Sequence, residues 1–343
     1  MKRVLITKLS SMGDLVHVMP ALSDATLAIP GIEFDWVVDQ SFKEVPLWHP
    51  SVHNLFITNH RAWRKNITSK TTWQEGISFY KELKKQKYDL IIDAQGNIKS
   101  ALISLIAQGK KAGWDASSVP EWGSHFFYSS RYPASGCFAS KKLHAIEKLR
   151  MLFAHALDYP LPSTPIFYGL DQTKFTLPSF PLPKDKYLLF VPIASYGSKL
   201  WQESHWQELI AKTTQKGYTV FIPWGNIKEK KRAERLAISS QVIVLPRLSL
   251  NEIAFLITKA HAMVSLDTGL SHIAAALNIP NITLYGPTDP IITGTLGENQ
   301  TWVQSPFPCP KNCKKSCFIE KTNPRCLHLI SPEMVWEKLA NLL

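Results

Sequence analysis

Short runs of aliphatic and β-branched residues alternate with amphipathic stretches along this chain, and the alternation begins twice. The apolar runs of the first series lie at residues 4–6, 34–38 and 89–93, and those of the second at 187–191, 218–222, 242–244, 262–265 and 281–285. Amphipathic stretches such as 206–216 and 250–260 fill the intervals of the second series. This alternation is typical of βα units around a parallel sheet. We therefore predict an α/β fold of two Rossmann-like, doubly wound domains.

The segment between the two series predicts the domain boundary. It carries six prolines from Pro160 to Pro183 and few helix signals, as interdomain connections do. A length of 343 residues also exceeds the usual size of one domain. We predict an N-terminal domain at 1–160, a proline-rich connection at 161–185, a C-terminal domain at 186–330 and a C-terminal helix at 331–343.

The first polar segment that follows a predicted strand contains Ser10, Gly13 and Asp14, ahead of a helix predicted to begin near Leu15. Ligands of open parallel sheets bind beyond the carboxyl ends of the strands, and two such domains facing one another would form a cleft. Asp14 is either a carboxylate directed into that cleft or a helix cap. The single glycine departs from G-x-G-x-x-G, which disfavours a nicotinamide or flavin site.

A second segment, residues 265–272, directly follows a predicted buried strand of the C-terminal domain. Asp267 or Thr268 can cap the next helix, and Gly269 permits a ligand to approach the backbone. Free amides and the helix dipole suit a phosphate, which predicts a diphosphate site. The alternative is a capped helix in which His272 only packs. The turn at 285–290 is expected on the same edge of the sheet.

Three further polar segments carry cations. Residues 194–201 follow the first strand of the second domain and place Lys199 beyond it, near a leaving diphosphate or exposed to solvent. Residues 96–100 resemble the end of a P-loop, but the first glycine and the Gly-Lys pair are missing, which excludes ATPase or kinase chemistry. The cluster at 61–65 interleaves cations with an aromatic residue, which suits nucleic acid, a phosphorylated head group or a solvated face.

The overall charge and the cysteines restrict partners and location. A net charge of +12 indicates a polyanionic partner: nucleic acid, an anionic membrane surface or a phosphorylated substrate. Lys8 interrupts the first apolar run, and no stretch has the roughly 18 to 20 apolar residues of a spanning helix. We predict a cytoplasmic protein with reduced thiols. The spacing of four cysteines differs from the common zinc ribbons, so we predict no metal. These are Cys309, Cys313, Cys317 and Cys326.

Taken together, the motifs resemble the bacterial heptosyltransferases of glycosyltransferase family 9, most closely the members that add the first inner-core heptose. The motifs that carry the resemblance are residues 4–14, 34–38, 93–96, 223–225, 267–272 and 285–290. The resemblance implies a GT-B fold and an inverting transfer from ADP-L-glycero-D-manno-heptose to Kdo of Kdo-lipid A, without a cofactor. It also implies peripheral contact with the anionic inner membrane, no nucleic-acid partner and a monomer.

The resemblance further implies roles for individual residues. Asp14 matches the general base, and Lys199 matches the lysine that steadies departing ADP. The residues that match donor-binding positions are Ser195, Glu229, Asp267, Thr268, Gly269 and His272. The residues that match acceptor-binding positions are Ser10, Gly13, Arg61, Arg64 and Lys65. Two positions depart from the pattern: Ala194 and Ser195 stand where a threonine pair is usual, and Ala62 replaces an arginine. The tail with the cysteines is more similar to that of the second heptosyltransferase or of related members.

Two other functions fit parts of the sequence. Another glycosyltransferase or an epimerase acting on a nucleotide-sugar would use the same scaffold. A basic protein that binds nucleic acid without catalysis would account for the charge alone.

Overall fold

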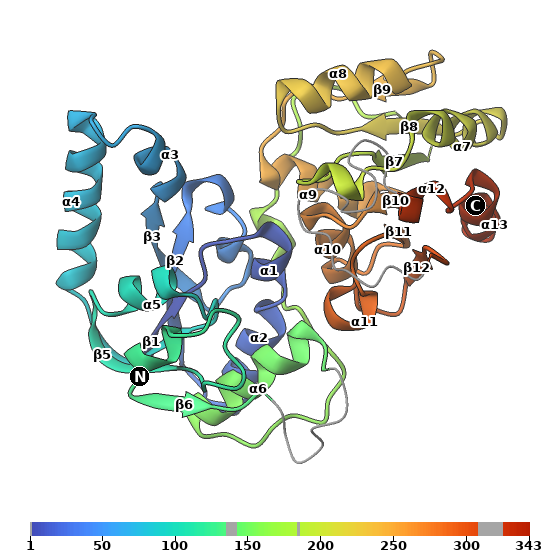
Figure 1. The fold of residues 1–343 in the computed structure, drawn as a ribbon. Coiled ribbons are helices and arrows are strands. Elements are labelled where there is room, and N and C mark those ends of the chain that lie inside the picture. Colours follow the sequence, from blue (N-terminus) through green and yellow to red (C-terminus); the bar gives the residue numbers. More distant parts are fainter. Residues whose placement is uncertain (1, 135–142, 184–185, 308–324) are drawn as a thin grey trace. The chain divides into compact units, whose positions relative to one another are not determined.

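The chain forms two compact units, residues 1–171 and 172–343, in a computed structural model that describes residues 2–134, 143–183, 186–307 and 325–343 (Figure 1). The division lies inside the segment rich in proline. Each unit contains one sheet and its own core.

Unit 1 is built on a six-stranded sheet in the order β3-β2-β1-β4-β5-β6. The strands are β1 (Arg3–Thr7), β2 (Glu33–Asp39), β3 (Val52–Thr58), β4 (Lys87–Asp93), β5 (Gln108–Trp114) and β6 (Ser130–Tyr132), and all neighbours pair in parallel. The order 3-2-1-4-5-6 is that of a dinucleotide-binding Rossmann fold. Its connections change direction between β1 and β4, where Leu5 pairs with Ile91.

Helices cover both faces of this sheet. The helical segments are α1 (Met12–Val16), α2 (Met19–Ala28), α3 (His60–Lys65), α4 (Lys70–Lys84), α5 (Ile98–Ser104), α6 (Ala145–Leu157) and the short η1 (Gln40–Phe42), η2 (Pro46–Trp48) and η3 (Ser124–Phe127). Alternate strand residues point to opposite faces. Leu5 and Ile91 therefore share a core cluster with Phe79 of α4, whereas Phe34 packs on Phe153 of α6.

Unit 2 repeats the same topology, with the strand order β12-β11-β10-β7-β8-β9. The strands are β7 (Tyr187–Val191), β8 (Thr219–Ile222), β9 (Val242–Val244), β10 (Ala262–Leu266), β11 (Asn281–Tyr285) and β12 (Gln300–Gln304), all in parallel pairs. Counted from β7, the order is again 3-2-1-4-5-6, and β7 lies beside β10. The prediction of two doubly wound α/β domains is confirmed.

The helices of unit 2 pack on its sheet, and polar side chains cap α8, α9, α11 and α13. They are η4 (Gln172–Lys174), η5 (Gly197–Lys199), α7 (Glu203–Gln215), α8 (Ile227–Leu236), α9 (Leu250–Lys259), α10 (Gly269–Ala276), α11 (Pro290–Thr293), α12 (Arg325–His328) and α13 (Pro332–Ala340). Ser249 and Glu252 form a capping box at the start of α9. The C-terminal helix α13 packs on α7 and places Val335 and Leu339 in the core.

Across the parts of the chain that the structure describes, no helix has both the length and the apolar character needed to cross a membrane.

Candidate functional site

In unit 1, the loop after β1 is held by the neighbouring strands β2 and β4. The indole of Trp36 donates to the carbonyl of Lys8 at 2.9 Å, and the amide of Leu9 donates to the side-chain oxygen of Gln95 at 2.7 Å. The Lys8 ammonium donates to the carbonyl of Ala94 at 3.0 Å. These bonds fix the course of this loop beside β1 and β4, where the connections of the sheet change direction. The sequence analysis did not assign a role to Gln95.

Asp14 lies in the first turn of α1, not ahead of the helix. The helix begins at Met12, so the predicted start near Leu15 is wrong by three residues. The physical reason is a capping box, because the Asp14 carboxylate accepts from the amide of Ser11 at 2.8 Å and from its hydroxyl at 2.7 Å. Asp14 is half-buried, whereas Gly13 is buried and Ser10 is half-buried. The carboxylate is oriented by Ser11 and still reachable from solvent.

A group of cations lies at the same carboxyl edge of the sheet. Lys99, in the first turn of α5, donates to His60 Nε2 at 2.9 Å. His60 Nδ1 lies 3.3 Å from a carboxylate oxygen of Asp39, at the end of β2, and Arg61 Nε lies 4.0 Å from the same oxygen. Sequence reasoning singled out Arg61 but missed His60 and Lys99. Residues far apart in sequence thus form one basic cluster.

Burial and neighbouring positive charges lower the pKa values of two basic groups in this cluster. Burial and the charge of Lys99 lower the pKa of His60, and burial and the charge of Arg61 lower the pKa of Lys99. An anion bound here would raise both pKa values again, because an opposite charge favours the protonated forms of His60 and Lys99. Arg64 and Lys65 are exposed in the last turn of α3. The cluster is suited to a carboxylate or phosphate.

Residues 96–100 are shaped by a buried carboxylate and do not form a phosphate loop. Asp93 accepts from the amides of Gln95 and Gly96 at 2.9 and 3.0 Å and from the hydroxyls of Ser100 and Tyr128 at 2.8 and 2.7 Å. Burial raises its pKa. Gly96 has a φ of +71°, and a Cβ there would lie 2.6 Å from Pro120. This network fixes the start of α5, which carries Lys99.

In unit 2, Asp267 joins the segments that follow β7, β10 and β11. Its Oδ2 lies 2.5 Å from Lys199 Nζ and accepts from the hydroxyl of Thr288 at 2.7 Å. Its Oδ1 lies 3.9 Å from His272 Nε2. Burial opposes ionisation, but the nearby His272 and the charge of Lys199 outweigh it, so the pKa of Asp267 lies well below its ordinary value. Asp267 is an anion that holds Lys199 in place.

The N-terminus of α10 lies next to the ion pair of Asp267 and Lys199. Thr268 is the N-cap residue, but its side chain makes no capping hydrogen bond, and the Asp267 side chain is directed to Lys199. The prediction that either side chain caps α10 is therefore wrong. The first amides of a helix lack partners within the helix, so those of Gly269 and Leu270 are suited to an anion. His272 is buried.

Two further predicted donor residues lie elsewhere in unit 2. Glu229 is in the first turn of α8, where its carboxylate accepts from the amide of Gly225 at 2.7 Å. Ser195 is exposed between β7 and η5. Neither contacts Asp267 through any interaction found in the described parts of the chain.

The predicted absence of a metal concerns four cysteines near the C-terminus. Cys309, Cys313 and Cys317 lie outside the described residues, and Cys326 is buried. Within the described ranges, no three His, Cys, Asp or Glu side chains are grouped so that they could hold a metal ion.

Comparison with known proteins gives a consistent likeness. Residues 77–323 match the model of glycosyltransferase family 9 (heptosyltransferase). Lipopolysaccharide heptosyltransferase 1 of Pseudomonas aeruginosa is 41% identical over 99% of this chain and 98% of its own length. E. coli heptosyltransferase WaaC, solved with ADP, is 37% identical with a TM-score of 0.85, over 99% of this chain and all (100%) of that one. It has also been solved with ADP-2-deoxy-2-fluoro heptose, with a TM-score of 0.84.

A more distant likeness shows the fold alone. E. coli ADP-heptose lps heptosyltransferase II is 21% identical, with a TM-score of 0.75 over 100% of this chain and 98% of that one. The likeness in sequence is therefore greater to the first heptosyltransferase than to the second.

Proposed function

Because the chain belongs to glycosyltransferase family 9, as its motifs predicted, we propose that it transfers L-glycero-D-manno-heptose from ADP-heptose to a Kdo residue of Kdo-lipid A. The protein is a glycosyltransferase with a GT-B fold. The observation that carries the proposed reaction is the 41% identity to a lipopolysaccharide heptosyltransferase 1 over nearly the whole of both chains.

Unit 2 is the proposed donor-binding unit. In our proposal, the diphosphate of ADP-heptose binds at the N-terminus of α10, where the amides of Gly269 and Leu270 and the helix dipole favour an anion. Lys199, held by Asp267 at 2.5 Å, neutralises the charge that develops on ADP as the bond to the anomeric carbon breaks. Asp267 is itself an anion, so we assign it a positioning role toward Lys199 and not direct contact with phosphate.

Unit 1 is the proposed acceptor-binding unit. Asp14 removes a proton from an acceptor hydroxyl while that oxygen attacks the anomeric carbon on the face opposite ADP, which inverts the configuration. Ser11 holds the carboxylate through two hydrogen bonds and so restricts its orientation. We propose that His60, Arg61 and Lys99, with Arg64 and Lys65 nearby, receive the anionic groups of the acceptor.

The remaining proposed donor contacts are peripheral to this chemistry. Ser195 and His272 would contact the diphosphate or the heptose, and Glu229 would contact the nucleoside. Ser10 and Gly13 would line the acceptor side. We also propose a monomer that works without a metal or cofactor on the cytoplasmic face of the inner membrane.

Incubation of the protein with radiolabelled ADP-heptose and Kdo-lipid A tests the reaction. We expect label in the lipid fraction only when both are present, and no transfer from labelled UDP-sugars. Transfer from a UDP-sugar alone, or salt-sensitive binding of RNA without any transfer, would replace the proposal with one of the alternatives.

A further inference from the structure

Helix α4 has two apolar stripes and buries only one of them. Phe79 and Leu83 are buried in the core of unit 1. Trp73, Ile77 and Tyr80 recur at intervals of four and three residues, which places them along one side of the helix, and all three are exposed, Trp73 to 60%. A surface helix normally shows polar residues on its solvent side. The outer stripe of α4 is therefore an exposed apolar surface, which indicates a site of interaction with another molecule.

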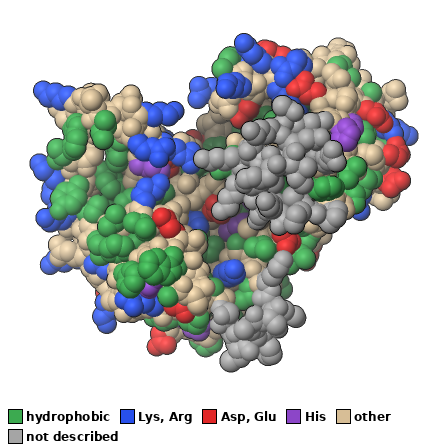
Figure 2. All heavy atoms as spheres, viewed as in Figure 1, with side chains coloured by type: hydrophobic (Ala, Val, Ile, Leu, Met, Phe, Trp, Pro, Cys, Tyr) green, Lys and Arg blue, Asp and Glu red, His purple; other side chains and the backbone are tan. Residues whose placement is uncertain are grey.

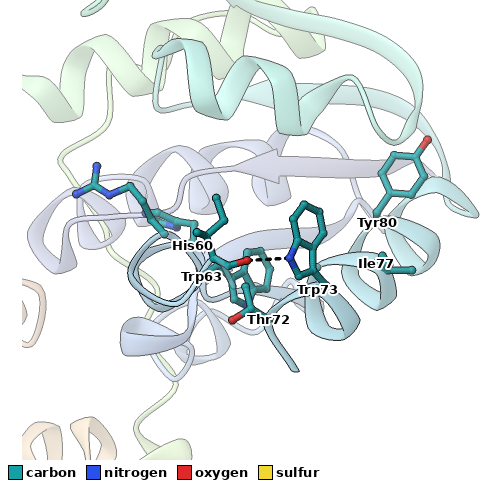
Figure 3. A pocket seen from close by; sticks show the side chains of 9 residues that line it. His60, Trp63, Thr72, Trp73, Ile77 and Tyr80 are labelled. Atoms are coloured by element: carbon teal, nitrogen blue, oxygen red, sulfur yellow. Dashed lines mark hydrogen bonds between the residues drawn. The ribbon is translucent and has the colours of Figure 1, made fainter. Parts of the chain in front are cut away.

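The outer stripe borders a hollow between α3 and α4 (Figure 3). The hollow has a volume of about 550 Å³, and its walls include Trp63, Ile67, Trp73 and Ile77. The Trp73 indole donates to the carbonyl of Ile67 at 2.8 Å, which ties the connecting loop to α4. The hollow is thus a fixed concave surface with mostly apolar walls, and His60 of the basic cluster also lines it.

Exposed apolar residues continue from α4 onto α5 and η3 of the same unit. Ile98 and Leu102 on α5 and Phe126 on η3 are exposed, and so is Trp122 just before η3. Helices α4 and α5 cover the same face of the sheet, and α5 packs on η3. Figure 2 shows hydrophobic side chains gathered over this side of unit 1, with Lys and Arg side chains around them.

Positive charge is concentrated in the same place. Residues 60–87 contain eight Lys and Arg against two Glu, a net charge of +6, which is half of the +12 of the chain. On α4 these cations include Lys81 and Lys84, and the Lys84 ammonium lies 5.3 Å from the centre of the Tyr80 ring. The surface therefore combines apolar side chains with a strong positive charge.

We propose that the outer face of α3, α4 and α5, here called the α4 face, docks on the surface of an anionic lipid bilayer. This inference rests on the proposed function, because Kdo-lipid A is a membrane glycolipid. Apolar and aromatic side chains enter the head-group region, while the lysines remain with the anionic lipids. Trp and Tyr are favoured at that depth because one end of each ring system is polar.

The composition of the α4 face favours a bilayer over nucleic acid. Proteins that bind single-stranded nucleic acid place aromatic rings in a basic groove, so that the bases can stack on them. Here aliphatic side chains, Ile67, Ile77, Ile98 and Leu102, are exposed together with the aromatic ones. Aliphatic groups gain from transfer into lipid and offer no surface on which a base stacks.

Sedimentation with vesicles tests the proposal. We compare vesicles of phosphatidylglycerol and phosphatidylethanolamine with vesicles of phosphatidylcholine alone, for the full chain and for Ile67→Ser/Ile77→Ser. These two side chains are 63% and 49% exposed. The matched control is Leu161→Ser/Leu177→Ser, which removes aliphatic side chains that are 54% and 63% exposed outside the α4 face.

We expect the wild type and the control to bind anionic vesicles equally, and Ile67→Ser/Ile77→Ser to bind them about tenfold more weakly. We also expect added salt to weaken the binding of the protein to anionic vesicles. The protein should bind only weakly to vesicles of phosphatidylcholine alone. The proposal is overturned if the wild type does not bind anionic vesicles, if the test variant binds as well as the control, or if an RNA oligonucleotide displaces the protein from them.

Heptose transfer to a deacylated, water-soluble Kdo acceptor separates this inference from the proposed function. We expect Ile67→Ser/Ile77→Ser to match the wild type with this acceptor, because the substitution leaves the proposed catalytic groups in place. Absence of transfer by the wild type would refute the proposed function. The vesicle experiment tests docking through the α4 face independently of that result.

Discussion

Replacement of Asp14 by Asn separates a general base from a helix cap, because the two roles predict effects of different size on different quantities. The amide keeps one oxygen that can accept from Ser11, and it removes the negative charge from the first turn of α1. Loss of a cap or of a favourable charge at a helix start costs about 1 kcal/mol or less. For a unit of 171 residues, that lowers Tm by about 2–4 °C.

The loss of a general base has a much larger effect on the rate. Proton removal by a positioned group contributes about 10²- to 10⁴-fold, which corresponds to about 3–5 kcal/mol of barrier. We therefore expect Asp14→Asn to lower kcat at least a hundredfold. The assay is transfer from ADP-heptose to Kdo-lipid A at saturating concentrations, with circular dichroism melting of the same preparations.

Unit 2 supplies a matched control for this experiment. The capping box of α9 has the same design, since the Glu252 carboxylate accepts from the amide of Ser249 and from its hydroxyl, both at 2.8 Å. Glu252→Gln should therefore lower Tm by a similar amount and leave kcat unchanged. If Asp14→Asn and Glu252→Gln changed kcat and Tm alike, Asp14 would be a cap and the proposed mechanism would lose its base.

Other substitutions test the ion pairs and a buried histidine. Lys199→Met should lower kcat about 10²-fold or more, and melting should show destabilisation of about 3 kcal/mol because it leaves the largely covered Asp267 carboxylate, 9% exposed, without its cation. Arg150→Met breaks the buried ion pair with Asp24, in which Nε and Oδ2 are 2.6 Å apart, and urea unfolding should show a loss of about 3–5 kcal/mol. Burial lowers the pKa of His49 from 6.5 to about 4. As pH falls through that interval, only unfolded His49 gains a proton, so stability should fall by about 3 kcal/mol, and His49→Gln should remove this part of the pH dependence in urea titrations.

The strands that the sequence predicted are those with continuous apolar runs. Strands β7, β10 and β11 are buried throughout, and their boundaries follow their composition. Strand β5, by contrast, contains Gly109, Lys110 and Lys111 and has no strand pattern. It forms because it pairs with β4, and a Cβ at Gly109 would lie 2.5 Å from the carbonyl oxygen of Tyr88. Pairing with a neighbour here outweighs local propensity, which composition cannot reveal.

The places of the candidate residues in the fold were predictable where these residues follow a strand directly. Contacts between residues far apart in the sequence were not predictable in this way. Ser11 and Asp14 have the spacing of a capping box, a local signal that could have placed the start of α1 correctly. The contact between His60 and Lys99 has no local signal, since they are 39 positions apart in the sequence. Lys199 and Asp267 are likewise 68 positions apart in the sequence, so their ion pair has no local signal either.

Topology explains these long-range pairs in both units. In the order 3-2-1-4-5-6, the first and fourth strands are neighbours although the chain between them forms two other strands. The segments after β1 and β4 therefore meet, which joins Leu9 and Ser10 to Gln95. The segments after β7 and β10 meet in the same way and join Lys199 to Asp267. Once the strand order is known, the motifs that follow these four strands are expected to meet in pairs, and the chemistry of each unit follows from which polar side chains those segments carry.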